Sequence, residues 1–385
     1  MKVLWVNPSF LDYRVALYHK MYEFLEGNFY LLFSQQRNPQ RVNDKIENAI
    51  GENAIGTTDE KNYIIGRKSD FANKYISIPY QKGLYKKIKE VNPDIIIAEG
   101  FFQWTPWAIR YAKKNKILIY IAYERTEHTE RNCPKWRIAY RKFISKYVTG
   151  YLVNGYETAK YLENSALSKG KIIVEGCMSA DSENLSRLVA SKTNEEKQII
   201  RQRIIGKRAG IIYLFVGQII ERKGVKQLLD AWNLHVEKHK EDSLLLVGGG
   251  DQLSSNKKKY GGLDGAFFLG TVDYDAISDY YAISDVFILP TLEDNWSLVI
   301  PEAMACSLPV ATSIYNGCYP ELVTKDNGYV FDSFKRESII EALSYFHKKN
   351  IDLKTMGKRS FEIEQNYTPE VVARRILKLL NIIKV

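Results

Sequence analysis

The alternation of short apolar runs with longer amphipathic stretches most constrains the fold of this chain. The runs are rich in Ile, Val, Leu, Phe and Tyr, and they recur along both halves of the sequence. This pattern is typical of βαβ units that build a mostly parallel sheet. The predicted strands are 2–6, 30–33, 95–98, 117–122, 150–154 and 172–174 in the first half, and 211–216, 243–247, 266–269, 286–289, 309–311 and 328–331 in the second.

Each set of strands begins and ends like a complete doubly wound sheet. The chain of 385 residues is long enough for two such domains. We therefore predict an α/β fold with two Rossmann-like domains, 1–180 and 181–367, that face a central cleft. The polar stretch 182–208 is predicted to form one or two helices, and a C-terminal helix, 368–385, should start at the cap Thr368 and pack back on the first domain. Ligands of open α/β sheets bind at the carboxyl ends of the strands.

Composition excludes several classes of protein. A hydrophobic fraction of 45% and a charged fraction of 26% are those of a globular protein. No apolar run reaches the roughly 20 residues of a membrane-spanning helix. The run 2–6 is too short for a signal-peptide core, so a cytoplasmic location is expected. The four cysteines show no CxxC spacing and are predicted to be free thiols, at positions 133, 177, 306 and 318.

The net charge of +10 has two competing interpretations. Lys and Arg gather between residues 82 and 146, where aromatic residues are interleaved with them. These residues are either solvated helix faces or a surface that lies on anionic lipid at the inner face of the cytoplasmic membrane. Nucleic acid is not expected as a partner, because no nucleic-acid-binding motif accompanies the charge.

The densest chemical signal is the segment 287–305. A buried strand leads into an acidic loop, and a helix is expected to open around Ser297. Asp294 in the loop and Glu302, expected two turns inside the helix, can both face one ligand. Backbone N–H groups at the helix start would meet a phosphate, and the deeper carboxylate can accept hydrogen bonds from a ribose diol. The candidate ligand-binding residues here are Asp294, Asn295, Ser297, Leu298, Val299 and Glu302.

The spacing Asp294-x7-Glu302, followed by Ala-Met-Ala-Cys-Ser-Leu-Pro-Val, resembles the E-x7-E signature of family 4 of the retaining GT-B glycosyltransferases, the group 1 glycosyltransferases. The first acid is Asp where the family has Glu, which shortens its reach. The resemblance implies that the second domain binds a nucleotide-sugar donor, that transfer proceeds with retention, and that no metal or other cofactor is needed.

Three further segments carry the resemblance. Residues 215–225 resemble the family's G-R-x(3–4)-K-G segment, in which an Arg and a Lys neutralise the diphosphate. Lys223 matches the Lys, Gln218 stands at the Arg position after Gly217, and Arg222 is a second candidate cation. The Gly248-Gly249-Gly250 turn corresponds to a segment that lines the donor cleft, and Val272 to the backbone contact with the nucleobase.

The first domain is implied to hold the acceptor. His128 lies after the strand 117–122, where family members often place a His that contacts the transferred sugar. The alternative is a loop histidine satisfied by Glu124 or Glu130. Where many members have a Gly-rich loop, this chain has the segment 7–14. The candidate acceptor-binding residues are Arg14, Arg125 and the aromatic residues Phe102 and Trp104, which are either stacking surfaces or core.

Two patterns that suggest metals are discounted. Asp273-Tyr274-Asp275 matches the D-x-D element of the GT-A fold, but here we interpret it as helix capping. His235 and His239 have the i,i+4 spacing that can hold zinc. No third ligand is near in the sequence, and the charged neighbours Glu237, Lys238 and Lys240 indicate a solvated region.

The sequence thus predicts a retaining, metal-independent glycosyltransferase with Asp294, His128 and Lys223 as catalytic residues. The resemblance implies a nucleotide diphosphate sugar as the donor, with UDP favoured over GDP. The expected acceptor is a glycan or a lipid-linked molecule of cell-surface polysaccharide biosynthesis. The alternatives are a nucleotide-sugar 2-epimerase of GT-B architecture and a non-catalytic basic membrane-binding module.

Overall fold

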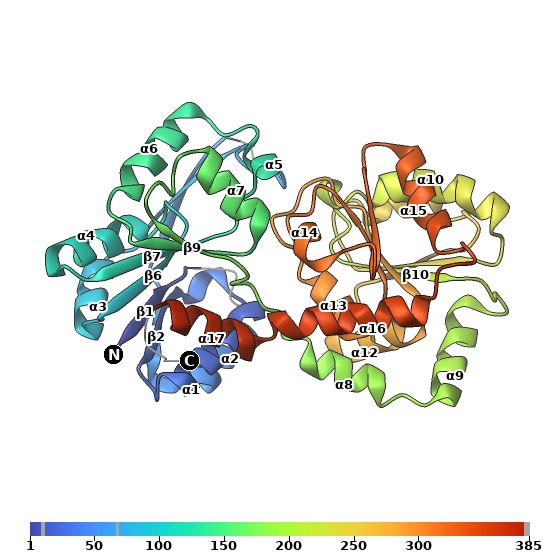
Figure 1. Ribbon diagram of the computed structural model, residues 1–385, viewed down its shortest axis with the longest axis horizontal. Coiled ribbons are helices and arrows are strands. Elements are labelled where there is room, and N and C mark those ends of the chain that lie inside the picture. Colours follow the sequence, from blue (N-terminus) through green and yellow to red (C-terminus); the bar gives the residue numbers. More distant parts are fainter. Residues whose placement is uncertain (9–11, 67–68, 381–385) are drawn as a thin grey trace. The chain divides into compact units, whose positions relative to one another are not determined.

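The computed structural model describes residues 1–8, 12–66 and 69–380. The chain divides into two compact units, of which unit 1 comprises Met1–Asp181 and Tyr367–Val385 and unit 2 comprises Ser182–Asn366. Each unit is built around its own parallel β-sheet with helices packed against it (Figure 1). Residues 9–11 of the segment 7–14 and residues 381–385 of the predicted tail helix lie outside the described part of the chain.

The sheet of unit 1 has the order β3-β2-β1-β6-β7-β8-β9, and every pair in it is parallel. The predicted runs of the first half all form strands, whereas β3 and the antiparallel β4–β5 hairpin are additional. The strands are β1 (Val3–Val6), β2 (Phe29–Ser34), β3 (Ala54–Thr57), β4 (Lys61–Ile65), β5 (Ile76–Tyr80), β6 (Ile95–Glu99), β7 (Leu118–Tyr123), β8 (Gly150–Val153) and β9 (Ile172–Val174).

Both faces of this sheet are buried, as the apolar runs require. Val3 and Trp5 of β1 pack in one core, and Leu4 and Val6 pack in the other, because successive side chains of a strand point to opposite faces. The helices of unit 1 are α1 (Val15–Phe24), α2 (Gln40–Ile50), α3 (Leu84–Val91), α4 (Thr105–Asn115), α5 (Glu127–Glu130), α6 (Lys135–Ser145), α7 (Tyr156–Asn164) and α17 (Pro369–Leu379), with the 3₁₀ turn η1 (Asp12–Arg14).

The helix α17 packs on the sheet of unit 1, although it follows unit 2 in the sequence. Thr368 is its N-cap, and the Thr368 hydroxyl accepts a hydrogen bond from the backbone N–H of Val371. Its apolar face is fully buried in the core that also contains α1, and this face consists of Val372, Ala373, Ile376 and Leu377.

The sheet of unit 2 has the order β12-β11-β10-β13-β14-β15, again with parallel pairs only. Its strands are β10 (Ile212–Val216), β11 (Ser243–Val247), β12 (Ala266–Gly270), β13 (Val286–Leu289), β14 (Val310–Ser313) and β15 (Gly328–Phe331). The order reverses around β10, whose neighbours are β11 and β13. The carboxyl ends of these strands are therefore the expected ligand-binding edge.

Helices of unit 2 follow the strands in alternation. The polar stretch 182–208 forms two helices, α8 (Glu183–Ala190) and α9 (Asn194–Ile205). The others are α10 (Val225–Lys238), α11 (Leu253–Tyr260), α12 (Tyr274–Ile283), α13 (Val299–Ala305), α14 (Tyr319–Leu322), α15 (Arg336–Tyr345) and α16 (Leu353–Glu364), with the 3₁₀ turn η4 (Glu221–Lys223).

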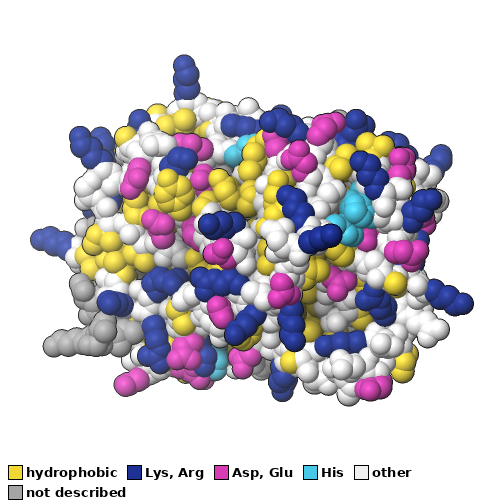
Figure 2. Space-filling model, turned by 45° about the vertical axis from the view of Figure 1, so that its right-hand side comes forward, with side chains coloured by type: hydrophobic (Ala, Val, Ile, Leu, Met, Phe, Trp, Pro, Cys, Tyr) yellow, Lys and Arg dark blue, Asp and Glu magenta, His cyan; other side chains and the backbone are white. Residues whose placement is uncertain are grey.

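The remaining composition-based predictions concern thiols and membrane segments. The four cysteines are free thiols in the structure. Among the described residues, no helix combines the length and the apolar character that crossing a membrane requires. Lys and Arg side chains are interspersed with Asp and Glu over the face that Figure 2 shows.

Candidate functional site

Three loops at the carboxyl edge of the unit 2 sheet pack so closely that they require glycine. A Cβ atom on Gly248 would lie 1.8 Å from the carbonyl oxygen of Gly217, and one on Gly224 would lie 2.0 Å from that of Pro290. Both glycines also have positive φ angles, 140° and 69°. The Gly217 N–H donates to the Val247 carbonyl at 3.0 Å, which joins the loops after β10 and β11. These loops thus form one continuous backbone surface.

The carboxylate of Asp294 lies at the centre of the charged residues at this edge. Its Oδ2 atom lies 2.5 Å from Lys223 Nζ and 3.4 Å from Arg222 Nη1. The Ser297 hydroxyl donates to the same oxygen at 2.6 Å. The structure therefore brings together Lys223, Arg222, Asp294 and Ser297, which the sequence had placed in two separate motifs. Two cations and one carboxylate leave this cluster with a net positive charge.

The electrostatics of Asp294 follow from this geometry. The side chain is only 12% exposed, and burial by itself would raise its pKa. The Lys223 ammonium and the Arg222 guanidinium outweigh burial and hold the pKa at about 2. Asp294 is therefore a charged hydrogen-bond acceptor at neutral pH, and a weak base.

The loop that carries Asp294 is held from two sides. The Leu292 N–H donates to the Arg222 carbonyl at 2.7 Å, and the Asp294 N–H donates to the Tyr315 carbonyl at 3.0 Å. Asn316 is fully buried, and its side-chain oxygen accepts a 3.3 Å hydrogen bond from the Ser297 N–H. The sequence analysis missed Asn316. The available signal was its position just after the apolar strand β14, at the carboxyl edge of the sheet.

Glu302 lies nearer the start of its helix than predicted. The helix α13 begins at Val299 with Leu298 as N-cap, so Glu302 is in the first turn rather than two turns inside. Ser297 was expected at the helix start, but its hydroxyl is bonded to Asp294, and the chain becomes helical only after Leu298. The Glu302 carboxylate is half-buried and accepts a 3.4 Å hydrogen bond from the Tyr281 hydroxyl of α12.

The other predicted donor residues lie in the loops around this cluster. Gln218 is exposed after β10, Val272 is half-buried after β12, and Asn295 is half-buried beside Asp294. Asp273 is the N-cap of α12, as the capping interpretation of D-x-D expected, but its side chain makes no capping hydrogen bond.

In unit 1, His128 lies on a short helix rather than in a loop. Thr126 is the N-cap of α5, and its hydroxyl accepts a hydrogen bond from the Thr129 N–H as part of a capping box. His128 is half-buried on its second residue. The Glu130 carboxylate pairs with basic residues, at 2.6 Å from Arg141 and 3.9 Å from Arg125. Arg125 therefore contributes to the ion pairs of Glu130 in this structure.

A buried ion pair lies at the carboxyl ends of β1 and β6. Arg14 is 4% exposed, and its guanidinium Nη1 lies 3.3 Å from Glu99 Oε1. The Trp5 indole N–H donates to the same Glu99 oxygen at 3.1 Å. Burial raises the pKa of Glu99 against the lowering effect of Arg14. The sequence analysis missed Glu99, which directly follows the apolar residues of its strand.

The two aromatic candidates of unit 1 have different environments. Trp104 is 1% exposed and belongs to the core, so the prediction that its ring offers a surface to an acceptor is wrong. Its indole N–H donates to Glu60 at 2.8 Å. Phe102 is only partly buried and stacks on Tyr140 with a centroid distance of 4.8 Å.

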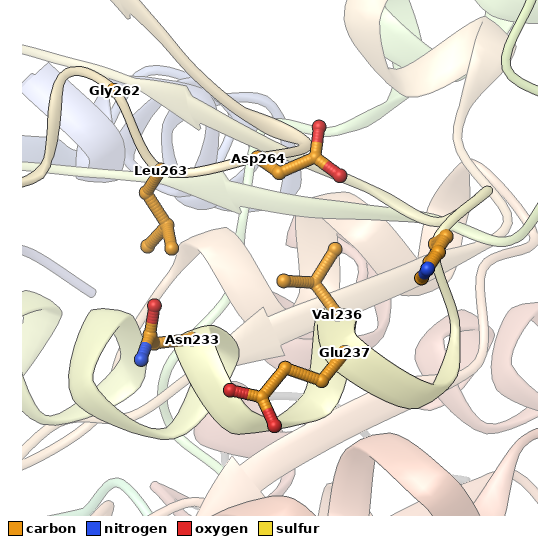
Figure 3. A pocket seen from close by; sticks show the side chains of 7 residues that line it. Asn233, Val236, Glu237, Gly262, Leu263 and Asp264 are labelled. Atoms are coloured by element: carbon orange, nitrogen blue, oxygen red, sulfur yellow. The ribbon is translucent and has the colours of Figure 1, made fainter.

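An open hollow of about 430 Å³ lies elsewhere on unit 2 (Figure 3). It is bordered by the end of α10 and the loop that precedes β12, which places it at the amino-end edge of the sheet. None of the predicted donor residues lines it, and its lining comprises Asn233, Val236, Glu237, Lys240, Gly262, Leu263 and Asp264. We therefore assign the candidate site to the Asp294 cluster.

The part of the chain that matches a known family lies within unit 2. Residues 196–363 match the family model described as glycosyl transferases group 1. This range contains every residue of the Asp294 cluster. The chain thus resembles the GT-B glycosyltransferases of family 4, as its motifs predicted.

Curated relatives match over part of their length. Sulfoquinovosyl transferase SQD2 of Arabidopsis thaliana is 27% identical over 152 residues, which are 38% of this chain and 29% of the relative. Mannosylfructose-phosphate synthase of Agrobacterium fabrum is 27% identical over 37% of this chain and 34% of its own length. The matches therefore span about a third of these relatives.

Solved structures share the fold over the whole chain. A glycosyltransferase of Rickettsia africae superimposes with a TM-score of 0.73 at 16% identity, over 98% of this chain and 97% of its own. HepE of Anabaena, solved in complex with UDP and glucose, gives a TM-score of 0.71 at 12% identity, with both chains fully covered. These similarities identify the fold as GT-B, with two Rossmann-like units.

Proposed function

We propose that this protein is a retaining glycosyltransferase whose unit 2 binds a nucleotide diphosphate sugar. The observation that carries the proposal is the Asp294 cluster at the ligand-binding edge of a sheet within the range matched by the group 1 model. A diphosphate leaving group gathers negative charge as its bond to the sugar breaks. Fixed cations at that point stabilise the transition state.

Lys223 and Arg222 are the proposed diphosphate ligands. Both cations contact Asp294, and the surplus positive charge of the cluster attracts an anion. A bound diphosphate would share Lys223 and Arg222 with Asp294. Because two cations are already in place, the proposal includes transfer without a divalent metal.

Asp294 is the proposed contact to the sugar hydroxyls. A carboxylate with a pKa of about 2 is a weak base and a poor nucleophile, which argues against a covalent glycosyl intermediate on it. We therefore favour front-face attack. The acceptor oxygen bonds to the anomeric carbon as the bond to the phosphate oxygen breaks on the same face, and the acceptor proton passes to the leaving phosphate.

The nucleoside is assigned to the half-buried groups on the neighbouring elements. Glu302 would accept hydrogen bonds from the ribose, and its contact with the Tyr281 hydroxyl orients the carboxylate. The backbone at Val272 would meet the base. A UDP-sugar is favoured over a GDP-sugar, and the structural similarity to the UDP complex of HepE supports this choice.

The acceptor is proposed to be a glycan or lipid-linked molecule of cell-surface polysaccharide synthesis, met by unit 1 at an anionic membrane. The support is an exposed apolar surface beside basic residues. Arg137 of α6 donates to Asn73 at 2.6 Å and so ties α6 to the loop between β4 and β5. Exposed apolar side chains on these elements are Tyr63, Ile64, Ile65, Ile78, Tyr80, Trp136 and Phe143. Lys135 and Lys142 accompany them on α6, and Lys146 is the C-cap of this helix.

Calorimetry with UDP and GDP, followed by a transfer assay, tests the proposal. Lys223→Ala should weaken binding of whichever nucleotide binds the wild type. Lys226→Ala is the matched control, because Lys226 is three residues away, is 55% exposed and pairs with Asp230. Equal affinity in wild type and Lys223→Ala would remove the cluster from the donor site. Conversion of the nucleotide sugar to its 2-epimer without acceptor would favour the epimerase instead.

A further inference from the structure

Three of the five histidines come together in unit 2, at the edge of the sheet opposite the loops that follow β10, β11 and β13. His235 is in the last turn of α10, His239 follows that helix, and His347 follows α15. The helices α10 and α15 pack side by side (Figure 1). Asp242 directly precedes β11, so the cluster lies at the amino ends of the strands.

Two of these imidazoles meet a single carboxylate oxygen. His235 Nε2 lies 2.8 Å from Asp242 Oδ2, and His347 Nε2 lies 2.7 Å from the same atom. The potential ligand atoms of His235, Asp242 and His347 all lie within 4.8 Å of one another. His239 stacks its ring on His347 at 3.8 Å and on His235 at 4.6 Å, so it presents a ring face to the group.

A backbone hydrogen bond orients the Asp242 carboxylate so that one of its oxygens faces both His235 and His347. Its Oδ1 atom accepts a 2.9 Å hydrogen bond from the Ile211 N–H, which leaves Oδ2 for the imidazoles. Such an outer hydrogen bond fixes the direction of a metal-binding carboxylate. His235 is 1% exposed, and its Nδ1 atom is buried without a hydrogen-bond partner among the described residues.

We propose that His235, Asp242 and His347 bind one Zn²⁺ ion. Two imidazole nitrogens and a carboxylate oxygen are a ligand set that zinc accepts, with water in the fourth position. Tetrahedral bonds of about 2.0–2.1 Å place the ligand atoms roughly 3.3 Å apart. The Asp242 oxygen would therefore separate slightly from each of the two imidazole nitrogens that it now contacts. His347 is 25% exposed, which gives an ion access from solvent.

The ion would join two parts of the chain that are distant in the sequence, because His235 and Asp242 are seven residues apart and His347 lies far beyond them. His347 lies 105 residues from Asp242, so a metal bridge would tie the end of α15 to the start of β11 and the end of α10. The loops that carry Lys223 and Asp294 are at the other edge of the sheet. The site would thus have a structural role, separate from the proposed sugar transfer.

The histidine spacing had been discounted because the sequence shows no third ligand and charged neighbours. Glu237, Lys238 and Lys240 are exposed, as predicted, but the structure places further ligand atoms beside His235 and buries its side chain. Asp242 and His347 supply the further ligands, and His235 faces the core although Glu237, Lys238 and Lys240 surround it in the sequence. His239, the second member of the i,i+4 pair, stacks on His347 and is not in the proposed ligand set. His347 is the second histidine ligand instead.

Zinc titration of tag-free, chelator-treated protein tests the inference. The wild type should bind one equivalent of Zn²⁺, its melting temperature should rise with zinc, and Co²⁺ should give the visible absorption of a tetrahedral site. His347→Gln should lower zinc affinity by at least about 100-fold, since loss of outer-shell groups alone costs 10–100-fold. His347 is partly exposed, so this variant should fold, and circular dichroism checks that it does.

His19→Gln and His239→Gln are the controls. His19 is on α1 in unit 1, and His239 stacks on the cluster without being a proposed ligand. Both should keep one equivalent of Zn²⁺ and the cobalt spectrum. Absence of zinc binding by the wild type, or equal affinity in wild type and His347→Gln, would overturn the inference. Neither result bears on nucleotide binding, so the two proposals fail or stand separately.

Discussion

The contact between Asp294 and Lys223 predicts an acid-sensitive contribution to the stability of unit 2. The carboxylate is nearly buried, and it contacts the Lys223 ammonium at 2.5 Å, the Ser297 hydroxyl at 2.6 Å and the Arg222 guanidinium at 3.4 Å. The ordinary pKa of 3.8 falls to about 2 in the folded protein. The folded state therefore holds a proton on Asp294 less readily than the unfolded state.

The sign and size of the effect follow from this difference in pKa. A depressed pKa in the folded state adds stability that is complete above the unfolded pKa of 3.8 and disappears as the pH falls to about 2. One pKa unit corresponds to about 1.4 kcal/mol, so the contribution is about 2 kcal/mol at neutral pH. It should not change between about pH 6 and pH 8, where Asp294 is charged in both states.

Urea unfolding of wild type and Asp294→Asn as a function of pH measures this contribution. Asn keeps the size of the side chain and can still accept from Ser297, but it does not titrate. The difference in unfolding free energy between the two proteins should shrink by about 2 kcal/mol from about pH 6 to pH 2. Asp264→Asn is the control, because Asp264 is 62% exposed beside Arg208 and its ion pair is screened by water. Parallel pH profiles for wild type and Asp294→Asn would refute the argument.

Four further outcomes are expected. Glu302→Ala should weaken nucleotide binding by about 1–3 kcal/mol, measured by calorimetry, because ribose hydroxyls lose an acceptor. Transfer should continue in excess EDTA, since Lys223 and Arg222 supply the positive charge; loss in EDTA with recovery on Mn²⁺ would refute this. Arg222→Gln should weaken UDP binding, and Gln218→Arg in that background should restore part of it. Sedimentation with anionic vesicles should be lost at high salt and after charge reversal of four lysines, with donor hydrolysis unchanged; those lysines are Lys86, Lys87, Lys113 and Lys114.

The strands of both sheets could be predicted because a doubly covered parallel sheet needs continuous apolar runs. All the predicted runs are strands, with ends that differ by a residue or two. The missed elements lack that signal. The strand β4 is exposed at every residue, and three of the four residues of β3 are only half-buried. Strands with so little burial need no apolar run, so this signal does not separate them from loops of similar composition.

Individual residues of the candidate site could be predicted where a single continuous segment of sequence carries the motif. Lys223 and Asp294 were named from separate segments, and their positions after β10 and β13 explain why they meet, since these strands are neighbours in the sheet. Their direct contact was not predictable, because it depends on side-chain directions in two loops. For the same reason Arg14 with Glu99, and His347 with Asp242, could not be inferred from sequence.

Two departures from the family pattern acquire a common explanation in the structure. Gln218 stands where the family has an Arg, and Asp294 stands where it has the first Glu. Arg222 is a second cation near Asp294, and its guanidinium reaches the Asp294 carboxylate from the 3₁₀ turn that also carries Lys223. The cluster thus contains two cations, the number in the family's G-R-x(3–4)-K-G segment, although one of them comes from a different position. The shorter side chain of Asp294 is consistent with this change of position, because the 3₁₀ turn brings Arg222 and Lys223 close to the loop that carries Asp294.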